Sequence, residues 1–257
     1  MPDPLATLFL GAVSLVAVGI PLVYLVSRAL KLAPPPIALD DPRRELRVAG
    51  FVVVVVYAVT VVSLFLPFGA SSWTDPGRVL TVAVMDGMLL AVVFVAAKST
   101  RQSFGSVGLS RKSPVRMLVL GLVPSALFVP SVGLMYYNPD AGFPGAGALA
   151  VALVWTAIVG FSEEITFRGY LQTRFEAAWG TGAGYAVAVV VFAFAHFPGS
   201  YVLYSGNVLS ALLSALGRVG LGLLLGFFYV RSRNVVPGAI SHWFYNFALV
   251  LWQVPNA

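Results

Sequence analysis

The sequence contains no cysteine, only two histidines and few charged residues. The absence of cysteine excludes disulfide bonds, thiol catalysis and thiolate metal ligands. Only 10% of the 257 residues are charged, against about 25% in soluble domains, while 59% are hydrophobic. This composition predicts an all-α, polytopic membrane protein whose main partner is the lipid bilayer.

The net charge of +6 does not come with a basic run that carries interleaved aromatic residues. Nucleic acid is therefore not an expected partner. The basic residues are instead distributed in a way that fits membrane topology, which depends on where the apolar spans lie.

A hydrocarbon core of about 30 Å needs about 20 apolar residues of helix. On that scale the sequence predicts one integral membrane domain over residues 1–257, a transmembrane bundle of about eight helices. Four N-terminal helices lie in 1–137, and 148–254 holds the helices that carry the polar motifs. The predicted spans are 5–26, 48–68, 79–97, 117–137, 148–167, 183–197, 207–230 and 235–254.

Alternation of these spans places every basic residue except Arg78 and Arg218 in the segments on one side of the membrane. The positive-inside rule makes that side cytosolic. We therefore expect both termini to face out. The expected location is a prokaryotic cell membrane, with the polar site facing the cytosol.

Two further patterns predict how the later helices pack. The fifth helix is expected to run past the membrane surface to a break at WGTGAG (179–184). In the seventh span, GLGLLLG places Gly222 and Gly226 in small-xxx-small spacing, which predicts a close helix contact.

A few ionisable residues fall at membrane depth, where an unpaired charge is costly. They are Asp86, Glu163, Glu164, Arg168, His196, Arg218 and His242. Because the break at 179–184 lies midway between Glu163 and His196, a hairpin centred there puts both side chains at one height. His242 follows the next inner turn, so a shared site is expected. Asp86 is expected to be a polar contact, and Arg218 to pair within the bundle or reach towards the surface.

Helical spacing assigns neighbours, because residues four apart share a face. Glu164 and Arg168 are four apart and are expected to form an ion pair, which leaves Glu163 to face a cavity. Phe192 can pack on His196 and line its pocket. Likewise, His242 and Asn246 present two polar groups to one side of their helix.

These groups suit two kinds of hydrolytic chemistry. In one, Glu163 activates water as a general base while His242 and Asn246 stabilise an oxyanion. In the other, Glu163, His196 and His242 bind Zn²⁺ and leave an open position, with Glu164 as the base unless Arg168 holds it. The sequence contains neither HExxH nor HxxEH, and no GxSxG.

Three segments resemble the signature motifs of a known family. EEITFR (163–168) fits EExxxR, FAFAH (192–196) fits FxxxH, and HWFYN (242–246) fits HxxxN. In this order they resemble the CPBP family of type II CAAX prenyl endopeptidases and bacteriocin-processing membrane proteins, often described as intramembrane metalloproteases. The resemblance covers residues 148–250.

The resemblance implies a conical cavity open to the cytosolic side and hydrolysis of a peptide bond near the C-terminus of a lipidated or hydrophobic protein. By the same resemblance, Glu163 activates the water and His196 helps to hold it. His242 and Asn246 stabilise the oxyanion, and Glu164 and Arg168 support the first motif. The resemblance leaves open whether a zinc ion takes part.

Two other functions fit a buried cluster of Glu and His. Such clusters also serve as proton relays in transporters, although the sequence shows no internal repeat. A non-catalytic scaffold or immunity protein could keep the same fold without the activity.

Overall fold

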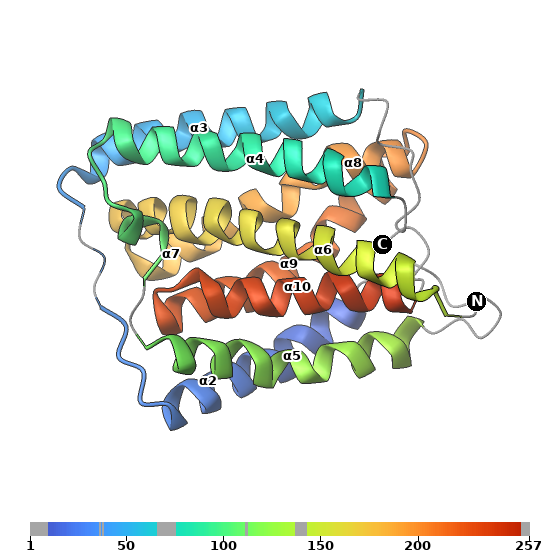
Figure 1. Ribbon diagram of the computed structural model, residues 1–257. Coiled ribbons are helices and arrows are strands. Elements are labelled where there is room, and N and C mark those ends of the chain that lie inside the picture. The colour runs from blue at the N-terminus through green and yellow to red at the C-terminus, as the bar shows by residue number, and fades with distance from the viewer. Residues whose placement is uncertain are drawn as a thin grey trace.

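The computed structural model describes residues 10–35, 37, 39–65, 76–110, 113–136 and 143–252, and Figure 1 shows them as a bundle of helices. Within these ranges there is no β-strand. In chain order the elements are the π-helix η1 (Leu15–Gly19), α2 (Ile20–Ala29), α3 (Pro42–Ser63), α4 (Pro76–Ser99), the 3₁₀-helix η2 (Phe104–Val107), α5 (Pro114–Tyr136), α6 (Ala146–Glu163), the π-helix η3 (Glu164–Gln172), α7 (Thr173–Ala195), α8 (Phe197–Leu203), α9 (Val208–Ser232) and α10 (Val235–Leu251).

Five helical segments of the described chain are long and apolar enough to cross a membrane. They are Leu10–Ala29, Pro42–Ser63, Val79–Ser99, Ala146–Leu203 and Val208–Ser232. The 58-residue segment Ala146–Leu203 contains two of the predicted spans, and two other predicted spans fall on the shorter apolar helices Pro114–Ala126 and Val235–Leu251. The fold class is therefore all-α with membrane-spanning helices, and the count of eight spans stays a prediction.

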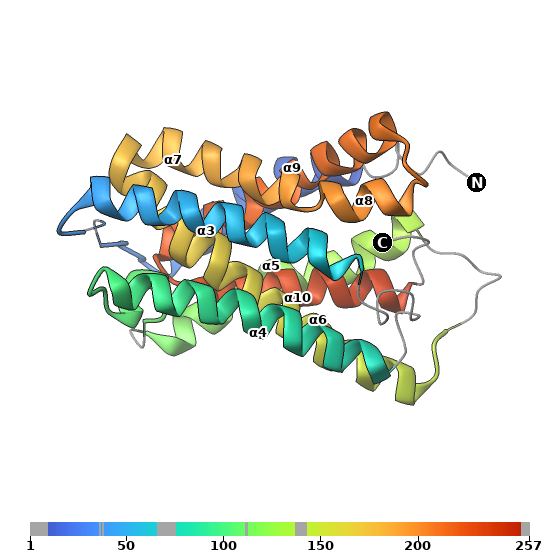
Figure 2. The same ribbon diagram turned by 90° about the horizontal axis from the view of Figure 1, so that it is seen from above.

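The helices lie roughly side by side, so that the loops gather at two opposite ends (Figures 1 and 2). Helix α10 packs between α5 and α6, while α7 packs against α9 and α3, and α4 packs against α3 and α6. Of the helices that carry the three motifs, α10 thus lies between two neighbours, whereas α7 lies at one edge of the bundle (Figure 2). α3 and α4 form one outer side of it.

The segment Ala146–Leu203 folds back on itself at Gly180. The backbone of Gly180 has φ 81° and ψ 163°, a conformation that a residue with a Cβ rarely adopts. The second half of α7 then returns beside η3. The break predicted at 179–184 is confirmed, and it fixes the register between Glu163 and His196.

The close helix contact predicted for α9 is also confirmed. A Cβ added to Gly226 would overlap the ring of Tyr185 on α7, and one on Gly222 would lie 3.1 Å from Val189 Cγ1. The absence of side chains lets α9 and α7 approach closely. By contrast, the short helix α8, directly after His196, does not correspond to any predicted element.

A buried polar network ties the elements together at the end where η2 and the Gly180 turn lie. The Nε of Arg174 lies 3.0 Å from Glu45 Oε2 on α3, and its Nη1 donates to the Ser106 carbonyl at 2.6 Å. Arg174 also stacks over the Tyr170 ring at 4.1 Å. This network joins α3, η2 and α7 around one buried cation.

Candidate active site

Glu163 and Glu164 lie at the junction of two kinds of helix. The α-helix α6 ends at Glu163, and the chain continues as η3, a π-helix whose nine residues are all buried. The sequence predicted an uninterrupted α-helix here, and nothing in the residue types marks the change. Since π segments occur often at functional sites, the junction itself singles out this position.

The two glutamates have different surroundings. The side chain of Glu164 is 1% exposed, with Oε2 3.6 Å from Arg168 Nε and Oε1 3.3 Å from His242 Nδ1. The side chain of Glu163 is 18% exposed, and its buried Oε2 has no hydrogen-bond partner among the described residues. Glu164 thus lies between Arg168 and His242, whereas Glu163 is the more exposed of the two; Oε2 of each makes no hydrogen bond with the described residues.

Both histidines turn the same ring nitrogen towards Glu163. Oε2 of Glu163 lies 4.0 Å from His196 Nε2 and 3.9 Å from His242 Nε2. The expected convergence of these three side chains is therefore present in the structure.

The opposite ring nitrogen of each histidine is fixed by an acceptor. His196 Nδ1 lies 2.9 Å from the Phe192 carbonyl oxygen, and His242 Nδ1 faces the Glu164 carboxylate. Because a carbonyl or carboxylate can only accept, Nδ1 carries the proton in both rings. In a neutral ring, Nε2 then presents a lone pair towards Glu163.

Phe192 forms the common wall of the site. Its ring is fully buried and contacts His196 edge-to-face at 4.9 Å between centroids, with His242 at 6.0 Å. The guanidinium carbon of Arg168 lies over the same ring at 4.1 Å. The predicted packing of Phe192 on His196 is present. The same ring also supports the other two motifs.

Arg168 is a buried cation whose neighbours are a carboxylate and an aromatic ring. Its side chain is 1% exposed, and none of its three nitrogens makes a hydrogen bond with the described residues. Its charge is balanced by the Glu164 carboxylate and by the face of the Phe192 ring. Arg168 therefore anchors the first motif to the second.

Asn246 is the motif residue with the fewest contacts. It lies on α10 one turn beyond His242, is half-buried, and makes no hydrogen bond with the described residues. Its amide is available to a ligand, in line with the expected shared face of His242 and Asn246.

Two polar residues near the site were not assigned to it from sequence. Ser162 Oγ donates a hydrogen bond to Asp86 Oδ1 on α4, and the Asp86 carboxylate interacts electrostatically with Glu163 and His242. Asp86 is a polar contact as expected, yet one that reaches the site. In the sequence, Asp86 could be noticed because it is an acidic residue in an apolar helix. Ser162 had no distinguishing feature except its position next to Glu163.

Arg218 pairs within the bundle, one of its two expected placements. Its Nη1 lies 2.7 Å from Ser214 Oγ and 3.0 Å from the Ser214 carbonyl oxygen, and Ser214 Oγ lies 3.0 Å from Ser200 Oγ. The side chain is held by this serine pair and does not reach an acidic partner there.

The three groups named for zinc do face one another, but their geometry does not make a metal site. Among the residues that the structure describes, no group of three or more His, Asp or Glu side chains is arranged to hold a metal ion. The zinc alternative gains no support from this arrangement.

The fold and this site define a helical membrane protein with a partly buried Glu–His–His cluster within the bundle. Residues 145–248 match the family model described as Type II CAAX prenyl endopeptidase Rce1-like. This part of the chain, from the start of α6 to most of α10, is a domain of that protease family, and the resemblance predicted from the three motifs is confirmed. No curated protein and no solved structure gives a significant match to the chain.

Proposed function

We propose that this protein is a membrane-embedded endopeptidase that hydrolyses a peptide bond near the C-terminus of a lipidated or hydrophobic protein. The observation that carries the proposal is the approach of Glu163 Oε2 to both Nε2 atoms, at 4.0 and 3.9 Å. A separation of this size allows one water molecule to hydrogen-bond to Glu163 Oε2 and to a histidine Nε2 at the same time.

In this mechanism Glu163 is the general base. Its free Oε2 takes a proton from the bridging water, and the Nε2 lone pair of His196 orients the same water. The resulting hydroxide attacks the scissile carbonyl carbon, so that the carbonyl oxygen becomes an oxyanion. Glu163 then delivers the proton to the leaving amine as the C–N bond breaks.

His242 and Asn246 are the proposed oxyanion donors. The Glu164 carboxylate beside His242 Nδ1 orients the ring, and a proton on Nε2 is then donated in a hydrogen bond to the oxyanion. The Asn246 side-chain amide supplies a second donor one turn along α10. Glu164 and Arg168 act through His242 and Phe192 and do not touch the substrate in this proposal.

We also propose that eight helices cross the membrane, that the site opens through a cavity to the cytosolic side, and that the protein lies in a prokaryotic cell membrane. The basic segments support this orientation. The loops after α2, α4 and α9, which carry or flank most of the basic residues, gather at the same end of the bundle (Figure 1).

The test is cleavage of a farnesylated C-terminal peptide by purified protein, with products identified by mass spectrometry. We expect the wild type to cut between the modified residue and the three that follow it. Glu163→Gln should lower kcat by at least about a thousandfold, since it removes the base but keeps the size of the side chain. Asp40→Asn is the matched control, because Asp40 is an exposed carboxylate in the loop between α2 and α3.

Equal cleavage by wild type and Glu163→Gln would refute the assignment of the base. If neither protein cleaves, prenyl peptides are not the substrate, and the same pair is then tested on unmodified hydrophobic C-terminal peptides. Uptake of a solute into proteoliposomes driven by a pH gradient would instead support a transporter.

A further inference from the structure

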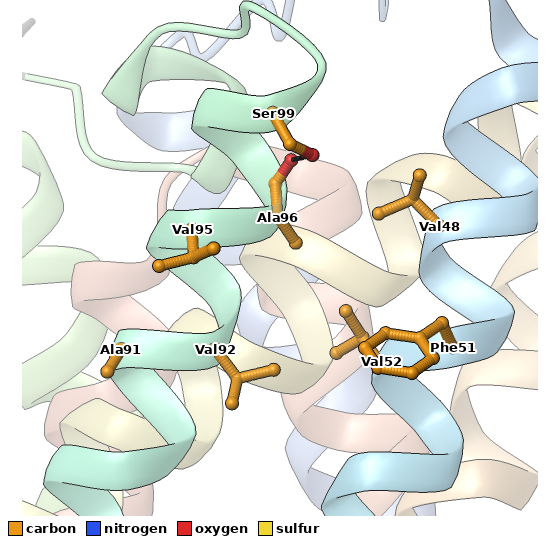
Figure 3. A pocket seen from close by; sticks show the side chains of 8 residues that line it. All are labelled: Val48, Phe51, Val52, Ala91, Val92, Val95, Ala96 and Ser99. Atoms are coloured by element: carbon orange, nitrogen blue, oxygen red, sulfur yellow. Dashed lines mark hydrogen bonds between the residues drawn. The ribbon is translucent and has the colours of Figure 1, made fainter.

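An apolar groove runs along the outer side of the bundle between α3 and α4. Figure 3 shows its two walls, with Val48, Phe51 and Val52 from α3 and Ala91, Val92 and Val95 among the residues from α4. The hollow has a volume of about 340 Å³ and ends at Ser99, the last residue of α4.

A second hollow continues the groove at the same end and is lined by two arginines. Arg44 and Arg47 line it together with Val48 and Phe51, which also line the apolar hollow. Both arginine side chains are exposed, and Arg44 Nη2 donates to the Ser99 carbonyl oxygen at 2.9 Å across the groove. No acidic side chain lines either hollow in the part of the chain that the structure describes.

The acidic residues near Arg44 and Arg47 interact with other groups, so the two guanidinium groups are available to a ligand. Glu45, which lies between them in sequence, is buried and paired with Arg174, and the Asp41 carboxylate accepts from the backbone N–H of Arg44 at the start of α3. Arg47 makes no hydrogen bond or ion pair with the described residues. The mouth of the groove is therefore positive, while its length is apolar.

We propose that this groove binds one anionic phospholipid of the membrane leaflet on the basic side. One of its two acyl chains lies between α3 and α4, and its phosphate is bound by Arg44 and Arg47. From Ala91 to Ser99 the groove follows α4 for about 12 Å, close to the depth of one leaflet. Arginine forms a planar, fork-shaped donor that suits phosphate oxygens. The proposal does not depend on peptidase activity.

The experiment counts lipid bound to the detergent-purified full chain by native mass spectrometry. The probes are dioleoylphosphatidylglycerol, which is anionic, and dioleoylphosphatidylcholine, which has the same chains and no net charge. We expect the wild type to retain one molecule of the anionic lipid in preference to the zwitterionic one. Arg44→Gln/Arg47→Gln should lower the affinity for the anionic lipid by about thirtyfold, because two arginines near an anionic headgroup are removed together.

A matched variant keeps the test specific. Arg43→Gln/Arg101→Gln removes two exposed basic residues from the same end of the molecule that line neither hollow, so its binding should stay within about twofold of wild type. Ala91→Trp fills the apolar part without changing charge and should abolish retention of the lipid.

Three results would overturn the proposal. One is equal loss of binding in the two double variants, which would show only a general effect of charge. Another is equal retention of the two lipids by the wild type. The third is displacement of the bound lipid by a farnesylated peptide, which would assign the groove to a substrate chain.

Discussion

Removal of the Arg174 side chain should destabilise the protein more than removal of any exposed basic residue. Arg174 is fully buried, forms an ion pair with Glu45 at 3.0 Å and donates to both the carbonyl and the hydroxyl oxygen of Ser106. Arg174→Met keeps most of the apolar volume but leaves the Glu45 carboxylate, 2% exposed, without its cation. Loss of one partner of a buried pair costs about 3–5 kcal/mol.

The double variant supplies the decisive comparison. Glu45→Met/Arg174→Met replaces both charges by apolar groups of similar size, which is often close to neutral for a buried pair. We therefore expect the double variant to be less destabilised than Arg174→Met alone, so that the two single effects do not add. Free energies of unfolding are measured by SDS titration in mixed micelles, followed by tryptophan fluorescence.

Arg101→Met is the control, because Arg101 is exposed in the loop after α4 at the same end of the bundle. Its effect should stay within about 0.5 kcal/mol. The reasoning is refuted if Arg174→Met costs no more than this control. It is also refuted if the effects of Glu45→Met and Arg174→Met simply add, because the two side chains then share no interaction.

Three more predictions concern the site. A Cβ on Gly160 would lie 2.9 Å from the backbone nitrogen of Trp243, so Gly160→Ala should push α6 from α10 and lower kcat by about tenfold or more, whereas Gly50→Ala, with no atom within 4 Å, should not. Asp86→Asn keeps an acceptor for Ser162 and should retain activity within about threefold, while Asp86→Ala should lose about tenfold in kcat with KM little changed; equal kcat in the two would deny Asp86 a positioning role. Treatment with 1,10-phenanthroline should leave peptide cleavage within about twofold of the untreated enzyme, and a loss of activity that added Zn²⁺ restores would establish the metal-dependent alternative.

The convergence of the motifs could be predicted because helix geometry and one break determine it. Each helical residue advances a fixed distance along the axis, so a turn midway between Glu163 and His196 brings them to one height. Gly180 makes that turn with a positive φ. The ion pair of Glu164 with Arg168 and the contact of Phe192 with His196 follow from the four-residue spacing within single helices.

The contacts between distant helices could not be predicted in this way. Glu45 and Arg174 are 129 residues apart, and Asp86 and Ser162 are 76 residues apart. Helices that are apolar on all faces give no periodic signal for the face they bury, since lipid and protein neighbours are equally apolar. The residue types of η3 also do not distinguish a π-helix from an α-helix.

The surroundings of the two adjacent glutamates support the different parts that we propose for them. A general base needs an acceptor atom that no cation or donor already occupies, and it must be reachable by water. Glu164 fits this role poorly, because Arg168 and His242 flank its oxygens and its side chain is 1% exposed. Glu163 fits this role better, because its side chain is 18% exposed and its Oε2 faces two histidine nitrogens, at 4.0 and 3.9 Å, and no arginine. In the proposed mechanism Glu163 moves the proton, and the Glu164 carboxylate orients His242 towards the oxyanion.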